Sequence, residues 1–154
     1  MIDVKDAIVT IDAMGCQREI ASRIIDKKAD YILSLKDNHP TLSNSVKLIF
    51  RHGEKDRFKG MHYLQKLEKV NDHGRQKRRR YTLISCKDQW SFGAMWPGMK
   101  SIGIVEVKRI VDGKTTYSIR YFLTSLMILC ATFENIGILK LTCIGLWMLA
   151  LLMI

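Results

Sequence analysis

The sequence predicts an α/β fold built around a parallel strand pair, followed by a region rich in β-strands. Three observations lead to this prediction. An apolar run at residues 7–11 ends at a carboxylate, a helical pattern follows it, and a second short apolar run follows the helix. Strands that alternate with helices in this way form a parallel sheet layer. From Tyr81 onward, alternating and β-branched residues indicate strands instead.

The first fifty residues contain the elements of the parallel layer. Residues 7–11 predict a buried strand, because the run is apolar and ends abruptly. Residues 17–28 predict a helix, since their isoleucines recur at helical spacing. Residues 31–35 predict a second strand, and Pro40 opens a helix that extends to about Phe50.

The next section of the chain changes from basic and polar to β-rich. Residues 51–80 are weakly patterned, which predicts either a loop or an exposed hairpin. Strands are expected at residues 81–86, 102–111 and 115–124. The last two are joined across Asp112–Gly113, a pair typical of tight hairpin turns.

Length, charge and cysteine content limit the classes of protein to consider. The 154 residues provide one domain or slightly more, and the net charge of +10 favours a polyanionic partner, either nucleic acid or an anionic membrane surface. Four cysteines and four histidines without ligand spacing argue against a zinc site or a disulfide framework. No N-terminal signal peptide is visible, so the expected location is cytoplasmic.

Asp12 is the first candidate site residue. It follows the first predicted strand directly, and open α/β sheets bind ligands at the carboxyl ends of their strands. Metal-dependent phosphoryl transfer needs a carboxylate on a rigid strand end, because Mg²⁺ demands near-ideal oxygen geometry. The plainer interpretation of the same residue is a helix N-cap. The residue type and position leave both interpretations open.

The residues around Asp12, TIDAMGCQREIASRIIDKKADYILSLKDNHPTL, resemble the second-aspartate region of bacterial insertion-sequence DDE transposases. The likeness is to the branch of the H-repeat-associated proteins. It resumes at DHGRQKRRRY (72–81), WPGMKSIGIVEVKRIVDGKTT (96–116) and IRYFLTSL (119–126), in family order. It therefore covers most of residues 1–126.

This resemblance implies a partial ribonuclease-H-like fold with a β-rich insertion. Residues 1–50 would be the later part of the catalytic core. Residues 51–126 would be a basic loop and β-rich insertion leading back to the core. Residues 127–154, which the resemblance does not cover, are almost wholly apolar and are expected to form a C-terminal helix.

The resemblance also implies a reaction and its partners. Asp12 would be the second carboxylate of an Asp-Asp-Glu triad that holds Mg²⁺ for DNA strand cleavage and transfer. Intact relatives would bind terminal inverted repeats as oligomers. The first Asp is expected upstream of residue 1 and the Glu beyond Leu126, so this chain is expected to be a truncated transposase. We expect it to be catalytically incomplete and to retain DNA affinity.

A dense basic cluster is the second candidate site. It consists of Arg75, Lys77, Arg78, Arg79 and Arg80. Such a cluster can contact DNA phosphates, although a solvated charged loop would look the same. The resemblance favours DNA. A small basic nucleic-acid-binding module without catalytic ancestry is the alternative.

The tail allows two interpretations. Residues 136–154 are mostly Leu, Ile and Met and are about long enough to span a bilayer, which predicts a tail-anchored membrane protein as a further alternative. The other hypothesis is a frameshift just after Leu126, because the family's helix with the third carboxylate is absent there. On that hypothesis Glu134 carries no catalytic role.

Overall fold

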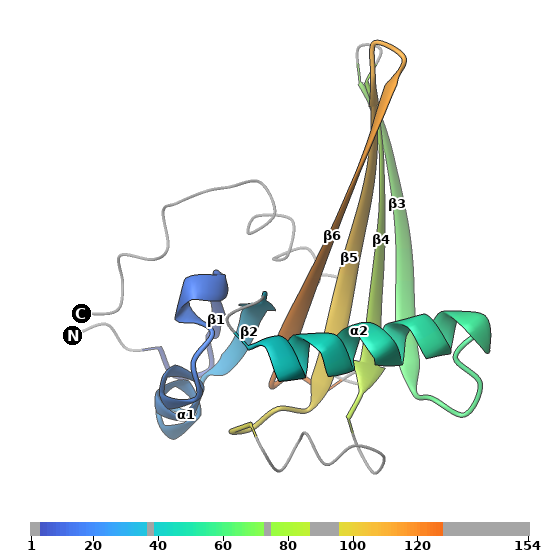
Figure 1. The fold of residues 1–154 in the computed structure, drawn as a ribbon. Coiled ribbons are helices and arrows are strands. Elements are labelled where there is room, and N and C mark those ends of the chain that lie inside the picture. The colour runs from blue at the N-terminus through green and yellow to red at the C-terminus, as the bar shows by residue number, and fades with distance from the viewer. Residues whose placement is uncertain (1–3, 37–38, 73–74, 87–95, 128–154) are drawn as a thin grey trace.

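A mixed sheet of six strands forms the centre of the structure, in the order β1-β2-β6-β5-β4-β3 (Figure 1). The computed structural model of the chain describes residues 4–36, 39–72, 75–86 and 96–127. The predicted apolar C-terminal helix, the predicted tail at 136–154 and the frameshift hypothesis concern residues outside these ranges. The α/β class predicted from the sequence is confirmed for the described residues.

The parallel layer predicted from the first fifty residues is present. Strand β1 (Ile8–Ile11) pairs in parallel with β2 (Asp30–Leu35), in a register that places Ile11 beside Leu33. Helix α1 (Arg18–Asp26) connects them, as a parallel pair requires a crossover. A short 3₁₀ turn, η1 (Ala13–Gly15), lies between β1 and the helix.

Helix α2 (Pro40–Lys55) is longer than the sequence indicated. It begins as predicted with Pro40 at its first turn, where the missing N–H costs nothing. It continues beyond Phe50 to Lys55, and Asp56 follows at its C-cap. Residues 51–55 are helical, and Gly53 is the only one of these five that is buried.

Four long antiparallel strands follow α2. They are β3 (Tyr63–Asp72), β4 (Arg75–Ser85), β5 (Ser101–Val111) and β6 (Lys114–Thr124). Of the two structures predicted for residues 51–80, the exposed hairpin is the one observed for β3 and β4. Strand β4 begins six residues before the predicted start at Tyr81. The turn between β5 and β6 has positive φ at Asp112 (49°) and Gly113 (72°), as a two-residue hairpin of this type requires.

Strand β6 returns the chain to the parallel layer. Its last residues pair antiparallel with β2, from Tyr121 beside Leu35 to Thr124 beside Ile32. Two hydroxyls fix this junction: Thr124 Oγ1 donates to the Tyr31 carbonyl (2.7 Å), and the Tyr31 amide donates to Ser125 Oγ (2.9 Å). The sheet is therefore continuous from the first strand to the hairpins.

The two faces of the sheet differ in what covers them. Both helices pack against one face, here called the helix face, where Ala21, Ile24, Val46 and Ile49 join the strands in one core cluster around Leu33. The opposite face carries a second cluster, to which no described helix contributes: Ile32, Tyr81, Leu83, Val105, Val107, Phe122 and Leu126. Gly103 on β5 allows close approach here, because a Cβ at this position would collide with the ring of Phe122.

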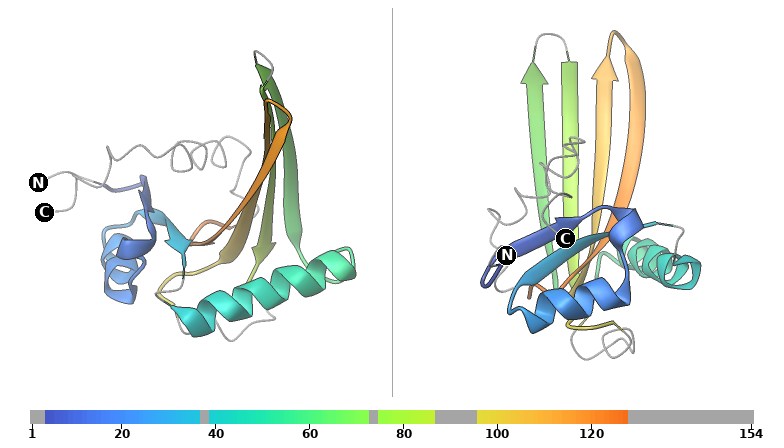
Figure 2. Two further views of the ribbon diagram at one scale, coloured as in Figure 1. Left: turned by 45° about the horizontal axis from the view of Figure 1, so that its top comes forward. Right: turned by 90° about the vertical axis from the view of Figure 1, so that its left-hand side faces the viewer.

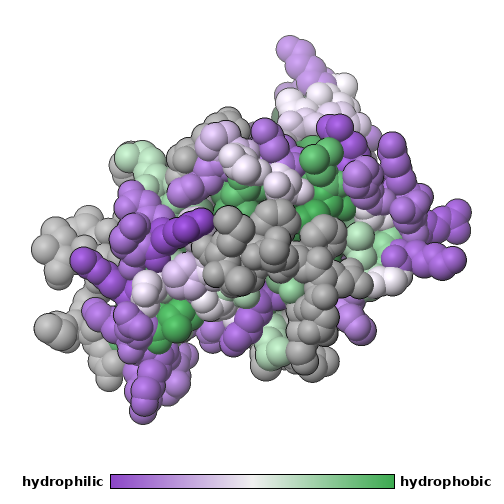
Figure 3. All heavy atoms as spheres, turned by 60° about the horizontal axis from the view of Figure 1, so that its bottom comes forward, coloured by the Kyte–Doolittle hydropathy of each residue, from purple (hydrophilic) through white to green (hydrophobic). Residues whose placement is uncertain are grey.

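The four hairpin strands extend far beyond the helices, as Figures 1 and 2 show. We call this projecting part the arm and define it as residues 67–72, 75–80 and 106–119. The rest of the described chain is the base. Most of the described surface in Figure 3 is hydrophilic, with smaller apolar patches between. Within the described ranges, no helix has the length and apolarity needed to cross a membrane.

Candidate functional site

Asp12 lies at the carboxyl end of β1, as predicted. Its side chain is 76% exposed, and its Oδ1 lies 3.9 Å from Nζ of Lys36, the residue that follows β2. Asp12 occupies the N-cap position of η1 but forms no capping hydrogen bond through its side chain. The N-cap interpretation therefore does not account for this carboxylate, which remains open to solvent beside a lysine.

A pocket of about 190 Å³ opens beside Asp12. The pocket lies at the carboxyl ends of β1 and β2. The first half of α2 and residues 119–121 of β6 also line it. Its polar lining residues are Asp12, Ser34, Lys36, Ser43, Lys47 and Arg120. Three of these side chains are cations and one is an anion, so the pocket is suited to a negatively charged group.

The residues of this site do not fit a two-metal centre on their own. Across the described ranges, no group of three or more His, Cys, Asp or Glu side chains could hold a metal ion. Asp12 has a lysine, rather than a second carboxylate, as its charged neighbour. Hard divalent cations need several oxygen ligands, which this arrangement does not supply.

Cys16, close to Asp12 in sequence, is a buried packing residue. It is fully buried in the helix-face core, and burial raises the pKa of its thiol to about 12. A thiol in this state is inert as a nucleophile near neutral pH. Trp96 is likewise buried in the helix-face core.

The five residues of the predicted basic cluster all lie on β4 and divide into two groups. Arg75 and Arg78 are exposed, and Lys77 is partly exposed. Arg79 is buried, with its Nη1 4.0 Å from Glu68 Oε2. Arg80 is partly exposed and is held by two carboxylates. Arg75 and Arg78 are therefore the members of the cluster that solvent reaches most readily.

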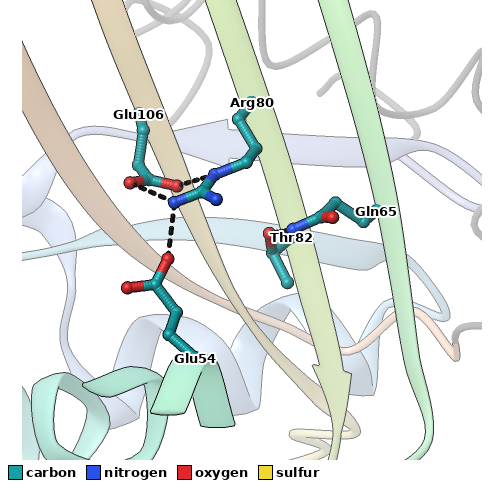
Figure 4. A network of polar contacts seen from close by, with 5 residues as sticks. All are labelled: Glu54, Gln65, Arg80, Thr82 and Glu106. Carbon is teal, nitrogen blue, oxygen red and sulfur yellow. Dashed lines mark hydrogen bonds and ion pairs between the residues drawn. The ribbon is translucent and has the colours of Figure 1, made fainter. Parts of the chain in front are cut away.

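Arg80 links the arm to helix α2. Its Nη2 donates to Glu106 Oε1 at 2.8 Å, its Nε donates to the other oxygen of Glu106, and its Nη2 also reaches Glu54 of α2 (Figure 4). Hydrogen bonding to Glu106 is the main cause of its raised pKa, which burial partly opposes. A bidentate arginine pair of this kind fixes geometry as well as charge.

The strand register brings together cations that the sequence did not group. On the helix face, one row across the arm consists of Lys69, Arg78, Lys108 and Tyr117. The Lys108 ammonium lies 5.5 Å from the centre of the Tyr117 ring, close enough for a cation–π contact. On the opposite face, the neighbouring row pairs Lys77 with Arg109.

Overall the arm carries nine lysines and arginines and four carboxylates, a net charge of +5. Lys108 and Arg109 of β5, which are distant from β4 in sequence, could have been grouped with the cluster only by predicting the hairpin register.

Comparison with known proteins finds relatives that are named as transposases. The chain is 34% identical over 126 residues to the "Uncharacterized protein in dhlA 3'region" of Xanthobacter autotrophicus, covering 81% of this chain and 41% of that protein. It is 32% identical over 129 residues to "Putative transposase YncI" of Escherichia coli O157:H7, covering 81% of this chain and 32% of the relative. No family model and no solved structure matches.

A third relative carries the name that the sequence resemblance pointed to. "H repeat-associated putative transposase YhhI" of Escherichia coli K12 is 28% identical over 130 residues, covering 81% of this chain and 34% of that protein. The chain thus spans about a third to two fifths of the length of these relatives. Relatives with transposase names thus align with most of the described residues, and the chain is similar over most of its length to the H-repeat-associated transposases.

Proposed function

We propose that this chain is a DNA-binding part of a transposase, with the arm as its DNA-binding surface. The observation that carries the proposal is the similarity over 81% of the chain to proteins named as transposases. The α/β layer followed by a β-rich insertion is consistent with the partial ribonuclease-H-like core expected from the resemblance. In the proposed whole protein, the partner is DNA at terminal inverted repeats, bound by an oligomer.

The charge rows on the arm support DNA as its partner. Lys69, Arg78 and Lys108 are direct cross-strand neighbours on one face. Like charges directly opposite each other in a sheet are destabilising. A polyanion would remove this repulsion, because each phosphate neutralises a cation and releases a condensed counterion. Tyr117 at the end of the row adds an aromatic surface that is 71% exposed.

In this proposal, Asp12 contributes one metal-binding carboxylate to the assembled transposase. Asp12 would there be one of the residues that hold Mg²⁺, and the bound ion would supply Lewis-acid chemistry for phosphodiester cleavage. The described residues provide a single carboxylate at this place, so we expect no cleavage by this chain alone. Mg²⁺-dependent nicking of DNA that disappears in Asp12→Ala would overturn that expectation.

The salt dependence of DNA binding tests the arm. Binding of the full chain to a random-sequence duplex is measured by fluorescence anisotropy over a range of salt concentrations. We expect Arg78→Gln combined with Lys108→Gln to weaken binding and to lower the slope of log K against log salt by about 2, since each lost phosphate contact removes about 0.9.

A charge-matched control lies on the base. Arg23 of α1 and Lys27 at its C-cap are exposed, so Arg23→Gln combined with Lys27→Gln removes the same charge from another surface. We expect this variant to keep the wild-type slope. Equal slopes for the wild type and both double variants would show that the arm is not the DNA-binding surface. An equal decrease of the slope in both double variants would show the same.

A further inference from the structure

The arm exposes large apolar side chains on the same face as its row of cations. Leu67, Tyr117 and Ile119 are 53%, 71% and 56% exposed. The strand register places all three on the helix face: Leu67 and Ile119 lie at the two ends of one row, and Tyr117 ends the neighbouring row of cations. Single apolar side chains on a surface are ordinary, whereas apolar side chains that gather on one face mark interaction sites. The helix face of the arm therefore offers apolar contact area beside its positive charge.

Tyr117 differs from Tyr63, the other exposed tyrosine of this face. The Tyr63 ring stacks on the ring of Phe58, with the ring centres 4.8 Å apart, and 44% of Tyr63 is exposed. The centre of the Tyr117 ring lies 5.5 Å from the Lys108 ammonium, and 71% of this residue is exposed. Lys108 thus holds the Tyr117 ring beside the row of cations and leaves most of the ring open to a stacking partner.

A double helix does not offer such a partner to this face. Four strands spaced about 4.8 Å apart make the face about 14 Å wide, whereas the major groove is roughly 12 Å wide and admits a two-stranded ribbon. A duplex lying on the arm would therefore contact the cations through its phosphates, while its bases remain stacked on one another. Unpaired bases expose their rings and stack on aromatic side chains, while cations hold the backbone. The combination on the helix face is suited to a single strand.

We propose that the helix face of the arm binds single-stranded DNA, with the Tyr117 ring stacking on an unpaired base and the row of cations contacting the phosphates beside it. This inference rests on the proposed function, because it takes DNA as the partner of the arm and specifies the form of that DNA. Ile119 lies two residues from Tyr117 on the same face of β6, roughly 7 Å away, and extends the apolar surface along the strand. The arm thus recognises bases as well as phosphates.

Three DNA probes test this inference on the full chain by fluorescence anisotropy at one salt concentration. They are a strand of twelve thymidine nucleotides, an abasic strand with the same backbone and no bases, and a random-sequence duplex. Stacking of one base should make the thymidine strand bind about 5- to 150-fold more tightly than the abasic strand. Equal affinity for these two strands, with duplex binding intact, would overturn the inference and leave the proposed function standing. Absence of binding to all three probes would overturn both.

The Tyr117→Ala variant separates base stacking from phosphate contact. We expect it to bind the thymidine strand as weakly as the abasic strand, and to keep the wild-type affinity for the duplex. Tyr117→Phe keeps the ring and should therefore keep the preference for the thymidine strand. A preference that survives in Tyr117→Ala would overturn the role of this residue. An equal loss of affinity for the thymidine strand and the duplex would overturn the assignment of base stacking.

Tyr63→Ala is the matched control, because it removes the other exposed tyrosine of the same face. This variant should bind all three probes like the wild type, and a loss equal to that of Tyr117→Ala would overturn the placement of the base at Tyr117. Since Tyr117 is largely exposed, Tyr117→Ala should leave the urea midpoint of unfolding unchanged, which separates weaker binding from loss of folding. The two proposals fail separately: the salt slope of duplex binding tests the cations, whereas the tyrosine variants test contact with bases.

Discussion

The base and the arm are built from the same strands, yet they differ in almost every physical property. On β6, residues 114–119 are exposed along their whole length, while Phe122, Leu123 and Thr124 are buried. The base packs against two helices on one face, whereas neither described helix covers the outer part of the arm. Strands therefore form in this sheet both where their side chains are buried in a core and where they are exposed. The backbone ladder holds most of the arm in the sheet, and Val107 near its start belongs to the second core cluster.

The largest predicted effect comes from removing apolar volume at the base. Leu123 is completely buried, so Leu123→Ala should lower the free energy of unfolding by about 2–5 kcal/mol. Ile119, four residues earlier on the same face of β6, is 56% exposed. Ile119→Ala should change the free energy of unfolding by no more than about 0.5 kcal/mol. Urea unfolding measures both, and similar losses in the two variants would contradict the division into base and arm.

The second prediction concerns alkaline pH and again affects the base. Burial raises the pKa of Cys16 to about 12 and that of Cys86 to about 11. An unfolded thiol loses its proton near pH 8.5, while these folded thiols keep theirs. Above about pH 8.5 the unfolded state therefore binds fewer protons, and stability falls as the pH rises, by about 1.4 kcal/mol for each pH unit and thiol.

Urea unfolding at several pH values tests the effect of the thiols. Cys16→Ala loses some packing at every pH, but its stability should fall less steeply between about pH 8.5 and pH 10 than that of the wild type. The same steepness in both proteins would show that Cys16 is not the source of the alkaline loss.

The smallest predicted effect lies at the boundary between the two regions. Arg80 pairs with Glu106 on β5 and with Glu54 on α2, and 40% of its side chain is exposed. Exposed ion pairs contribute about 0.2–1 kcal/mol, and salt weakens them. A double-mutant cycle of Arg80→Gln with Glu54→Gln should give a coupling free energy in this range that decreases at high salt. A coupling that does not change with salt would contradict an electrostatic link.

The base could be predicted from the sequence because its signals are local. An apolar run of four or five residues indicates β1, and Pro40 indicates the start of α2. The arm carried weaker signals. Strand β4 begins at Arg75 in a run of charged residues, so its side chains show no apolar alternation.

The site was predictable only in part, for a related reason. Asp12 was identified because it follows β1 directly. The remaining pocket residues come from β2, α2 and β6, and their meeting depends on the pairing of β6 with β2. The partners of Arg80 are each 26 residues away in sequence, so tertiary structure alone reveals that this arginine is held by carboxylates.

Strand β6 pairs with β2 only from Tyr121 onward, so residues 114–120 form one outer edge of the four hairpin strands, and β3 forms the other. Long unpaired edges are templates for intermolecular strand pairing and aggregation. Here those edges carry Lys66, Lys69, Lys114 and Arg120. Charged edge residues, lysine above all, oppose such pairing. Lys69, one of the cations proposed to bind DNA, thus also protects the arm from self-association. A variant that neutralises Lys69 would become more prone to aggregate as it loses affinity for DNA.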